Sequence, residues 1–195
     1  DARALAAIKP AKGAKFLLTH NYTGYPLVRQ ARELVKSGAL GKIRVVQVEY
    51  PQDWLSTPAD PGNKQAAWRT DPKRSGAGGA IGDIGTHAYN LARFITGLKT
   101  EAVSADLQSF VKGRKVDDNV HILLRFAGGA RGMLWASQVA PGNENGLQIR
   151  VYGEKAWLSW RQDNPNQMWF TELGTPAQLL TRGGAISQPP AASMN

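Results

Sequence analysis

The sequence predicts an α+β fold, in which a mainly antiparallel sheet follows a short segment of α/β type. Short β-rich runs fill the second half of the chain, and the turns at Gly128-Gly129 and Gly153–Lys155 are short enough to join antiparallel neighbours. A helical pattern followed by an apolar run opens the chain, in the order expected at the end of a parallel α/β unit. Between these two parts, a glycine-rich loop leads into one amphipathic helix.

The start of the chain supplies two predicted helices and two predicted strands. Asp1–Lys12 is alanine-rich and helical in character, and Ala14–Thr19 is expected to form a short buried strand. Pro26 suits the first position of the next helix and Gly38 suits its end, because proline presets a helical φ and glycine accepts the left-handed conformation that follows a last turn. Lys42–Tyr50 is rich in β-branched residues and is predicted as a strand.

Polar and aromatic residues directly follow the strand predicted at Ala14–Thr19. They begin with His20 and Asn21 and continue to Tyr22 and Tyr25. Open α/β sheets bind ligands just beyond the carboxyl ends of their strands. Tyr22 and Tyr25 are therefore expected either to line a site or to pack at a junction between domains.

The segment Gln52–Arg74 is long and irregular. Loops of this length in compact domains are usually functional or disordered. Trp54, Trp68 and Arg69 argue against disorder, because such residues are costly in a free linker. Arg69 and Arg74 are candidates to bind an anionic or polyhydroxyl ligand, and exposure to solvent is the alternative for each.

The stretch that organises the chain is the glycine-rich loop Ser75–Gly82, which runs into Asp83 and a helix that reaches Phe94. Asp83 has the chemistry of a helix N-cap. His87 follows four residues later and shares its helix face, and a carboxylate one turn from an imidazole suits general acid/base chemistry. From the spacing alone, a structural cap and a buried histidine remain the alternative. The apolar row of the helix is formed by Ile84, Ala88, Leu91 and Ile95.

A meander of strands completes the chain after Gly97 ends this helix. His121 lies within a predicted strand, and we interpret it as structural. Asp117 and Asp118 are adjacent, so a strand would point them to opposite faces, and we interpret them as a turn that enters a strand. The predicted strands are Val103–Val111, Val120–Phe126, Ala130–Val139, Leu147–Tyr152, Ala156–Trp160 and Gln167–Leu173.

Composition excludes several classes of protein. The chain of 195 residues has no cysteine, so it has neither a disulfide framework nor thiolate chemistry. Its three histidines are widely spread, which argues against a histidine metal site, and we expect no metal. No apolar run approaches the length of a membrane span and no signal peptide is visible, so we expect a cytoplasmic protein with no membrane partner.

The net charge of +9 is the only feature that favours nucleic-acid binding. The basic residues are scattered, apart from a cluster at Lys112–Lys115, and no nucleic-acid-binding motif is present. An anionic ligand such as a phosphorylated cofactor, or solubility, accounts for the charge equally well. We therefore expect no nucleic-acid partner.

Five motifs, taken together and in order, resemble the glucose-fructose oxidoreductase / inositol dehydrogenase / rhizopine catabolism (Gfo/Idh/MocA) family of NAD(P)-dependent sugar and cyclitol dehydrogenases. The resemblance extends from about Ala14 to about Phe170. The motifs are His20–Pro26, Ser37–Ile43, Trp68–Pro72, Gly78–His87 and Val151–Ala156.

The resemblance implies an open, mainly antiparallel sheet with helices on one face, preceded by the last helix and strand of a Rossmann domain. Residues 1–20 would be that remnant, and residues 21–195 would be a substrate-binding and oligomerisation domain that is incomplete at its C-terminus. His87 would exchange the hydroxyl proton of a sugar, anhydrosugar or cyclitol, with Asp83 in support, while NAD or NADP takes or gives the hydride. The other implied site residues are Arg69, Tyr22, Trp68 and Asn90 for the substrate, and His20 and Asn21 for the cofactor.

Two parts of the family pattern are absent from this sequence. The Gly-x-Gly-x-x-Gly fingerprint is missing, and Lys9-Pro10 follows Ile8 instead of the glutamate of the family's Glu-Lys-Pro motif, so its lysine receives no catalytic role. Asn90 stands where the family often has aspartate. The residues 1–195 alone are therefore expected to be inactive.

The alternative function is a non-catalytic scaffold or oligomerisation domain with a vestigial site. In this family the sheet face commonly packs against another subunit, so a homo-oligomer is expected with either function. The Asp83/His87 pair beside glycines favours the enzyme, because a scaffold does not need it.

Overall fold

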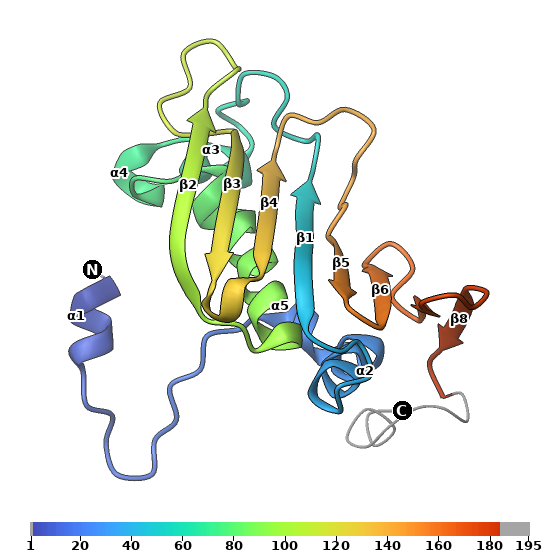
Figure 1. The fold of residues 1–195 in the computed structure, drawn as a ribbon. Coiled ribbons are helices and arrows are strands. Elements are labelled where there is room, and N and C mark those ends of the chain that lie inside the picture. The colour runs from blue at the N-terminus through green and yellow to red at the C-terminus, as the bar shows by residue number, and fades with distance from the viewer. Residues whose placement is uncertain (1, 184–195) are drawn as a thin grey trace.

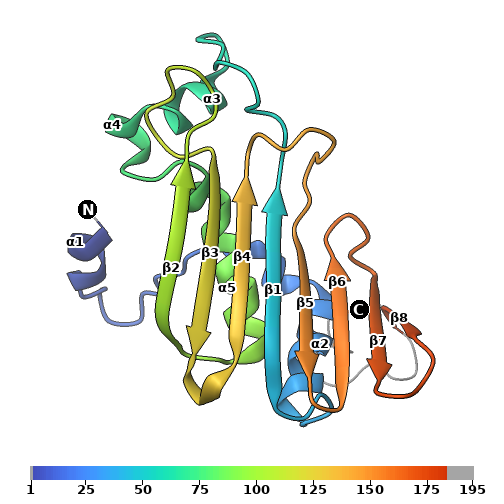
Figure 2. The same ribbon diagram turned by 45° about the horizontal axis from the view of Figure 1, so that its top comes forward.

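The computed structural model describes residues 2–183 and builds them around one eight-stranded sheet, with the strand order β2-β3-β4-β1-β5-β6-β7-β8 (Figures 1 and 2). The helical elements are α1 (Ala2–Ala7), η1 (Asn21–Gly24), α2 (Pro26–Lys36), α3 (Lys64–Arg69), α4 (Pro72–Ser75), η2 (Ile81–Gly85), α5 (Thr86–Thr96) and η3 (Ala127–Gly129). The strands are β1 (Ile43–Pro51), β2 (Thr100–Gln108), β3 (Asn119–Phe126), β4 (Arg131–Ser137), β5 (Gln148–Gly153), β6 (Ala156–Arg161), β7 (Gln167–Glu172) and β8 (Gln178–Thr181).

The predicted mainly antiparallel sheet is confirmed. β1 is parallel to β4, with Val48 opposite Leu134, and antiparallel to β5. The remaining neighbours are all antiparallel, including the pair β3 and β4 across the Gly128-Gly129 turn. The single parallel pair arises because the chain leaves β1 through α3, α4 and α5 before it returns to the sheet.

One face of the sheet packs against α2 and α5, which lie behind the strands in Figure 2. The whole predicted apolar row of α5 and the turn before it is buried, and it contacts alternate residues of the central strands. Each fully buried aliphatic side chain stabilises the fold by about 1.5–3 kcal/mol relative to its exposed state. This face therefore fixes the position of α5, and with it the position of Asp83 and His87.

The opposite face carries the other alternate residues, and no helix among residues 2–183 covers it (Figure 2). Leu123 and Met133 lie opposite each other on neighbouring strands and are 63% and 45% exposed. Trp169 and Leu179 form a similar pair on β7 and β8, with 46% and 41% exposure. On the same two strands as Leu123 and Met133, His121 stacks on Trp135, with ring centroids 6.2 Å apart.

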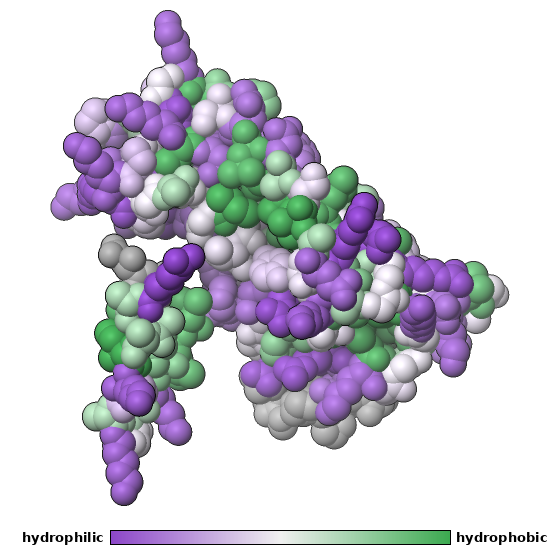
Figure 3. Space-filling view, turned by 60° about the vertical axis from the view of Figure 1, so that its left-hand side comes forward, coloured by the Kyte–Doolittle hydropathy of each residue, from purple (hydrophilic) through white to green (hydrophobic). Residues whose placement is uncertain are grey.

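The strand predicted at Ala14–Thr19 is wrong for this structure. These residues are irregular, and Phe16, Leu17 and Leu18 are 72%, 84% and 76% exposed. A strand needs a neighbour to satisfy its backbone, and none of the eight described strands lies beside this segment. The helix expected over Asp1–Lys12 is limited to α1, which stands apart from the sheet with hydrophobic side chains on its surface (Figures 1 and 3).

Smaller differences concern the ends of elements. The segment Gln52–Arg74 contains the short helices α3 and α4, and β2 begins three residues before the predicted Val103. β8 has no counterpart in the prediction. Its four residues, Gln178-Leu-Leu-Thr181, do not alternate between apolar and polar, so the sequence shows no strand periodicity there. No helix among residues 2–183 is both long and apolar enough to cross a membrane.

Candidate functional site

The glycine-rich loop is fixed by Asp117, which sequence analysis placed in a turn. The Asp117 carboxylate accepts hydrogen bonds from the backbone N–H groups of Gly79 (2.7 Å) and Ile81 (2.8 Å). Its carbonyl oxygen accepts from the N–H of Ala80 at 2.9 Å. An added Cβ at Gly79 would lie 2.0 Å from that carbonyl oxygen, so a glycine is needed at this contact between two backbone segments.

Asp83 is not the N-cap that the sequence predicted. It lies inside η2, a π-helical turn that leads directly into α5, and its own N–H donates to the carbonyl oxygen of Gly79 at 3.0 Å. The helix start is capped instead by Asp117, from a segment far along the chain. The Asp83 carboxylate is therefore free of a capping role and turns toward other side chains.

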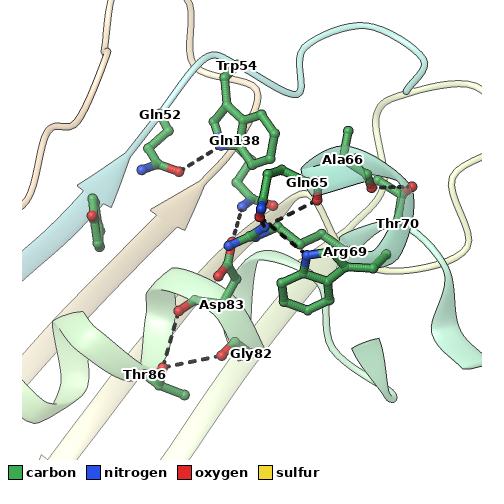
Figure 4. A network of polar contacts seen from close by, with 12 residues as sticks. Gln52, Trp54, Gln65, Ala66, Arg69, Thr70, Gly82, Asp83, Thr86 and Gln138 are labelled. Atoms are coloured by element: carbon green, nitrogen blue, oxygen red, sulfur yellow. Dashed lines mark hydrogen bonds and ion pairs between the residues drawn. The ribbon is translucent and has the colours of Figure 1, made fainter. Parts of the chain in front are cut away.

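Two side-chain donors meet at one oxygen of Asp83 (Figure 4). Arg69 Nε and Gln138 Nε2 each donate to Asp83 Oδ2 over 2.8 Å. The Arg69 and Asp83 side chains are 22% and 23% exposed, so the ion pair is partly shielded from water. Arg69 ends α3 and Gln138 follows β4, so three separate elements bring this cluster together.

His87 lies among aromatic rings. His20, Tyr22 and Tyr50 meet its ring edge to face, with centroid separations of 5.4, 5.1 and 6.5 Å. Within residues 2–183, the Nδ1 atoms of His20 and His87 are buried without a hydrogen-bond partner. Burial lowers the pKa of His87, the neighbouring His20 lowers it further, and the charge of Asp83 opposes both. The imidazole is therefore neutral near neutral pH and can accept a proton.

A buried hydrogen-bonded chain supports this aromatic group. Tyr50 donates to Asn145 Oδ1 over 2.6 Å, and Gln52 Nε2 donates to the same oxygen over 2.9 Å. Because the Tyr50 proton is used in this way, the hydroxyl of Tyr22 donates to that of Tyr50. Burial and the hydrogen bond from Tyr22 raise the pKa of Tyr50, so its hydroxyl stays protonated.

A cavity of about 830 Å³ runs past these groups along α5. Asp83 and His87 both border it, and the other predicted site residues that border it are His20, Trp68, Arg69 and Asn90. Tyr22 packs against His87 instead of bordering the cavity. Asn21 is exposed and is not among the lining residues. The structure thus brings together most of the site residues that the resemblance implied.

Sequence reasoning missed Gln138, Tyr50, Asn145 and the capping role of Asp117. Gln138 meets Asp83 across 55 sequence positions, and Tyr50 meets Asn145 across 95. No local pattern marks contacts of that range, and Gln138 lies inside the strand predicted at Ala130–Val139, whereas in the structure it directly follows β4. Within residues 2–183, no three His, Cys, Asp or Glu side chains gather in an arrangement that could hold a metal ion.

Comparison with known proteins gives one family. The model of the GFO/IDH/MocA C-terminal domain matches residues 28–159. The uncharacterized oxidoreductase YfiI of Bacillus subtilis is 33% identical, with 94% of this chain and 47% of that protein covered. The chain thus spans about half the length of the curated relatives it matches.

Solved structures agree in fold. The crystal structure of an oxidoreductase from Sinorhizobium meliloti has a TM-score of 0.81 and 52% identity, covering 93% of this chain and 47% of that one. An inositol dehydrogenase homolog from Azotobacter vinelandii, in complex with NADH and myo-inositol, has a TM-score of 0.82 and 35% identity, covering 89% and 44%.

Proposed function

This chain belongs to the GFO/IDH/MocA family, and we propose that it is the substrate-binding part of a longer NAD(P)-dependent dehydrogenase. The enzyme would oxidise or reduce a secondary alcohol of a sugar, anhydrosugar or cyclitol. Residues 1–20 would end its dinucleotide-binding domain, and residues 21–195 would form the substrate-binding and oligomerisation domain. The observation that carries the proposal is a neutral histidine and a carboxylate, His87 and Asp83, on one cavity.

In the direction of oxidation, the alcohol becomes a carbonyl as its O–H and C–H bonds break. His87 takes the hydroxyl proton, for which its lowered pKa and neutral ring prepare it. A bound NAD or NADP would supply the acceptor for the hydride that leaves the carbon. Asp83 accepts a hydrogen bond from a substrate hydroxyl and stabilises the imidazolium that forms. In reduction, His87 returns the proton to the alkoxide oxygen.

The remaining site residues bind and orient. Trp68 and Asn90 border the cavity, with Arg69 beside Asp83, and Tyr22 packs against the ring of His87. His20 presents an unpartnered buried Nδ1 at the same cavity and fits the polar nicotinamide end of the cofactor. Asn21, its neighbour, remains a cofactor residue by resemblance alone.

The uncovered sheet face supports a homo-oligomer. Its pairs Leu123/Met133 and Trp169/Leu179 expose apolar surface that a second subunit would bury. The same face is the observation that favours the alternative function, a non-catalytic oligomerisation scaffold.

The test is turnover by the full-length protein with NAD or NADP and a panel of sugars, anhydrosugars and cyclitols. His87→Ala should lower kcat by about 10²–10⁴-fold, the contribution usual for a general acid/base. His121→Ala is the matched control, because this histidine lies on the other face of the sheet and should leave kcat unchanged. Residues 1–195 alone should show no turnover. A full-length protein that is inactive on every substrate, yet oligomeric, would favour the scaffold.

A further inference from the structure

Arg69 makes its hydrogen bonds within the protein. Nε donates to Asp83, and Nη1 donates to the side-chain oxygen (2.6 Å) and the carbonyl oxygen (3.2 Å) of Gln65. The guanidinium carbon also lies 4.3 Å from the ring centre of Trp68 and 5.6 Å from that of Trp54. Arg69 is thus oriented before any ligand binds.

The elements that carry these contacts are themselves anchored. Asn63 caps α3 by accepting from the N–H groups of Gln65 and Ala66. The loop that carries Trp54 is held by Arg114, whose guanidinium donates to the carbonyl oxygens of Leu55 (2.9 Å) and Thr57 (3.1 Å). The orientation of Arg69 is therefore fixed both by α3, which carries it, and by the loop that carries Trp54.

Gln138 is the second donor to Asp83, and it is only 2% exposed. Its backbone N–H donates to the carbonyl oxygen of Asp118 over 2.8 Å, and its carbonyl oxygen accepts from the N–H of Leu55 over 3.1 Å. A buried amide held at both backbone groups has little freedom to move. It presents Nε2 to Asp83 from a fixed position.

Both donors bind Oδ2, and neither engages Oδ1. We propose that Arg69 and Gln138 are positioning residues that hold the Asp83 carboxylate by one oxygen, so that the other oxygen accepts a hydrogen bond from a substrate hydroxyl. This inference rests on the proposed dehydrogenase function. It assigns Arg69 an effect through Asp83, in place of a direct contact with substrate.

The two roles of Arg69 differ in their kinetics. A residue that only binds substrate contributes to KM, whereas a residue that orients a reacting group contributes to kcat. Loss of the positioning contact would let the carboxylate rotate away from the hydroxyl that it must meet. Once Asp83 itself is neutralised, further loss of Arg69 should matter little, because residues that act as a unit are not additive.

The experiment compares Arg69→Met, Asp83→Asn and the double variant in the full-length protein, with Arg74→Met as the matched control. The sequence left Arg74 open between ligand binding and exposure to solvent, and the structure places it exposed on the neighbouring α4, outside the cavity lining. Arg69→Met should lower kcat by about 10–100-fold with KM changed less than about threefold, and should change kcat less than about threefold in the Asp83→Asn background. Gln138→Leu should act in the same direction, and melting temperatures verify that each variant folds.

A rise in KM with kcat retained, or additive losses in the double variant, would overturn the positioning role and make Arg69 a direct substrate ligand. A wild-type protein with no turnover would instead remove the proposed function, and this inference with it. The two failures are therefore distinguishable in the same set of measurements.

Discussion

The molecule contains two arginine–aspartate ion pairs that differ in their separation, their exposure to solvent and their other hydrogen-bond partners. Arg69 and Asp83 are 2.8 Å apart and retain 22% and 23% side-chain exposure beside the cavity. Arg114 and Asp118 are 3.4 Å apart and retain 3% and 0%. Asp118 also accepts from the backbone N–H groups of Phe110 and Val111, so both of its oxygens are engaged.

The comparison indicates that the Asp118 carboxylate is structural, whereas the Asp83 carboxylate has an oxygen available to a ligand. The Arg114–Asp118 pair joins the loop after β1 to the loop before β3, and burial there is compensated by a complete set of partners. Asp83 is held at one oxygen and faces a cavity. The candidate site is thus distinguished by a partly buried carboxylate with only one oxygen hydrogen-bonded. An ion pair alone does not distinguish it, because Asp118 has one too.

The largest expected effect is the difference in stability between two matched variants, in which asparagine replaces either Asp118 or Asp83. Asp118→Asn removes the charge opposite a buried arginine and should destabilise the protein by about 3–5 kcal/mol, which lowers the melting temperature by on the order of 10 °C. Asp83→Asn should cost under about 1 kcal/mol, since its pair is partly exposed to solvent, while abolishing most turnover. Thermal melts of both full-length variants measure the difference. Equal losses would mean that the two pairs are not distinct in kind.

The sequence predicted which residues border the cavity better than how they are held there. The buried row of α5 followed from helical periodicity, and Asp83 and His87 followed from spacing together with a family resemblance. The capping role was assigned to the wrong aspartate, because Asp83 precedes an apolar helix as an N-cap does. The actual cap, Asp117, reaches Gly79 across 38 positions, and only the packed sheet creates that contact.

The strand predicted at Ala14–Thr19 fails for a related reason. Its apolar residues satisfy the local pattern of a buried strand, but a strand is completed by its neighbours. The described sheet provides no neighbour there. Gln138 and Tyr50 were missed because their roles depend on partners that sequence spacing does not reveal.

An effect of intermediate size is expected in the glycine-rich loop before Asp83. It shows whether this loop is as rigid as the buried Arg114–Asp118 pair. Gly79→Ala would place a Cβ 2.0 Å from the Asp117 carbonyl oxygen, and overpacking of this kind costs about 2–3 kcal/mol. Gly82→Ala is the matched control, because nothing lies within 4 Å of its added Cβ. We expect a clear fall in melting temperature for Gly79→Ala alone. Similar melts for the two variants would show that the Asp117 contact yields easily.

The smallest expected effect is the change of protein stability with pH that His87 causes. Because burial and His20 lower the pKa of His87, the unfolded chain binds its proton at higher pH than the folded chain does. Stability is therefore full above the ordinary histidine pKa of about 6.5 and declines as the pH falls below it. His87→Gln should flatten this decline in melting temperature between pH 8 and pH 5, with His121→Gln, on the other face of the sheet, as the matched control. A decline that survives in His87→Gln would place the acid sensitivity elsewhere. His87 would then not be the neutral imidazole expected beside Asp83. The free carboxylate oxygen would remain as the chemical difference between the Asp83 site and Asp118.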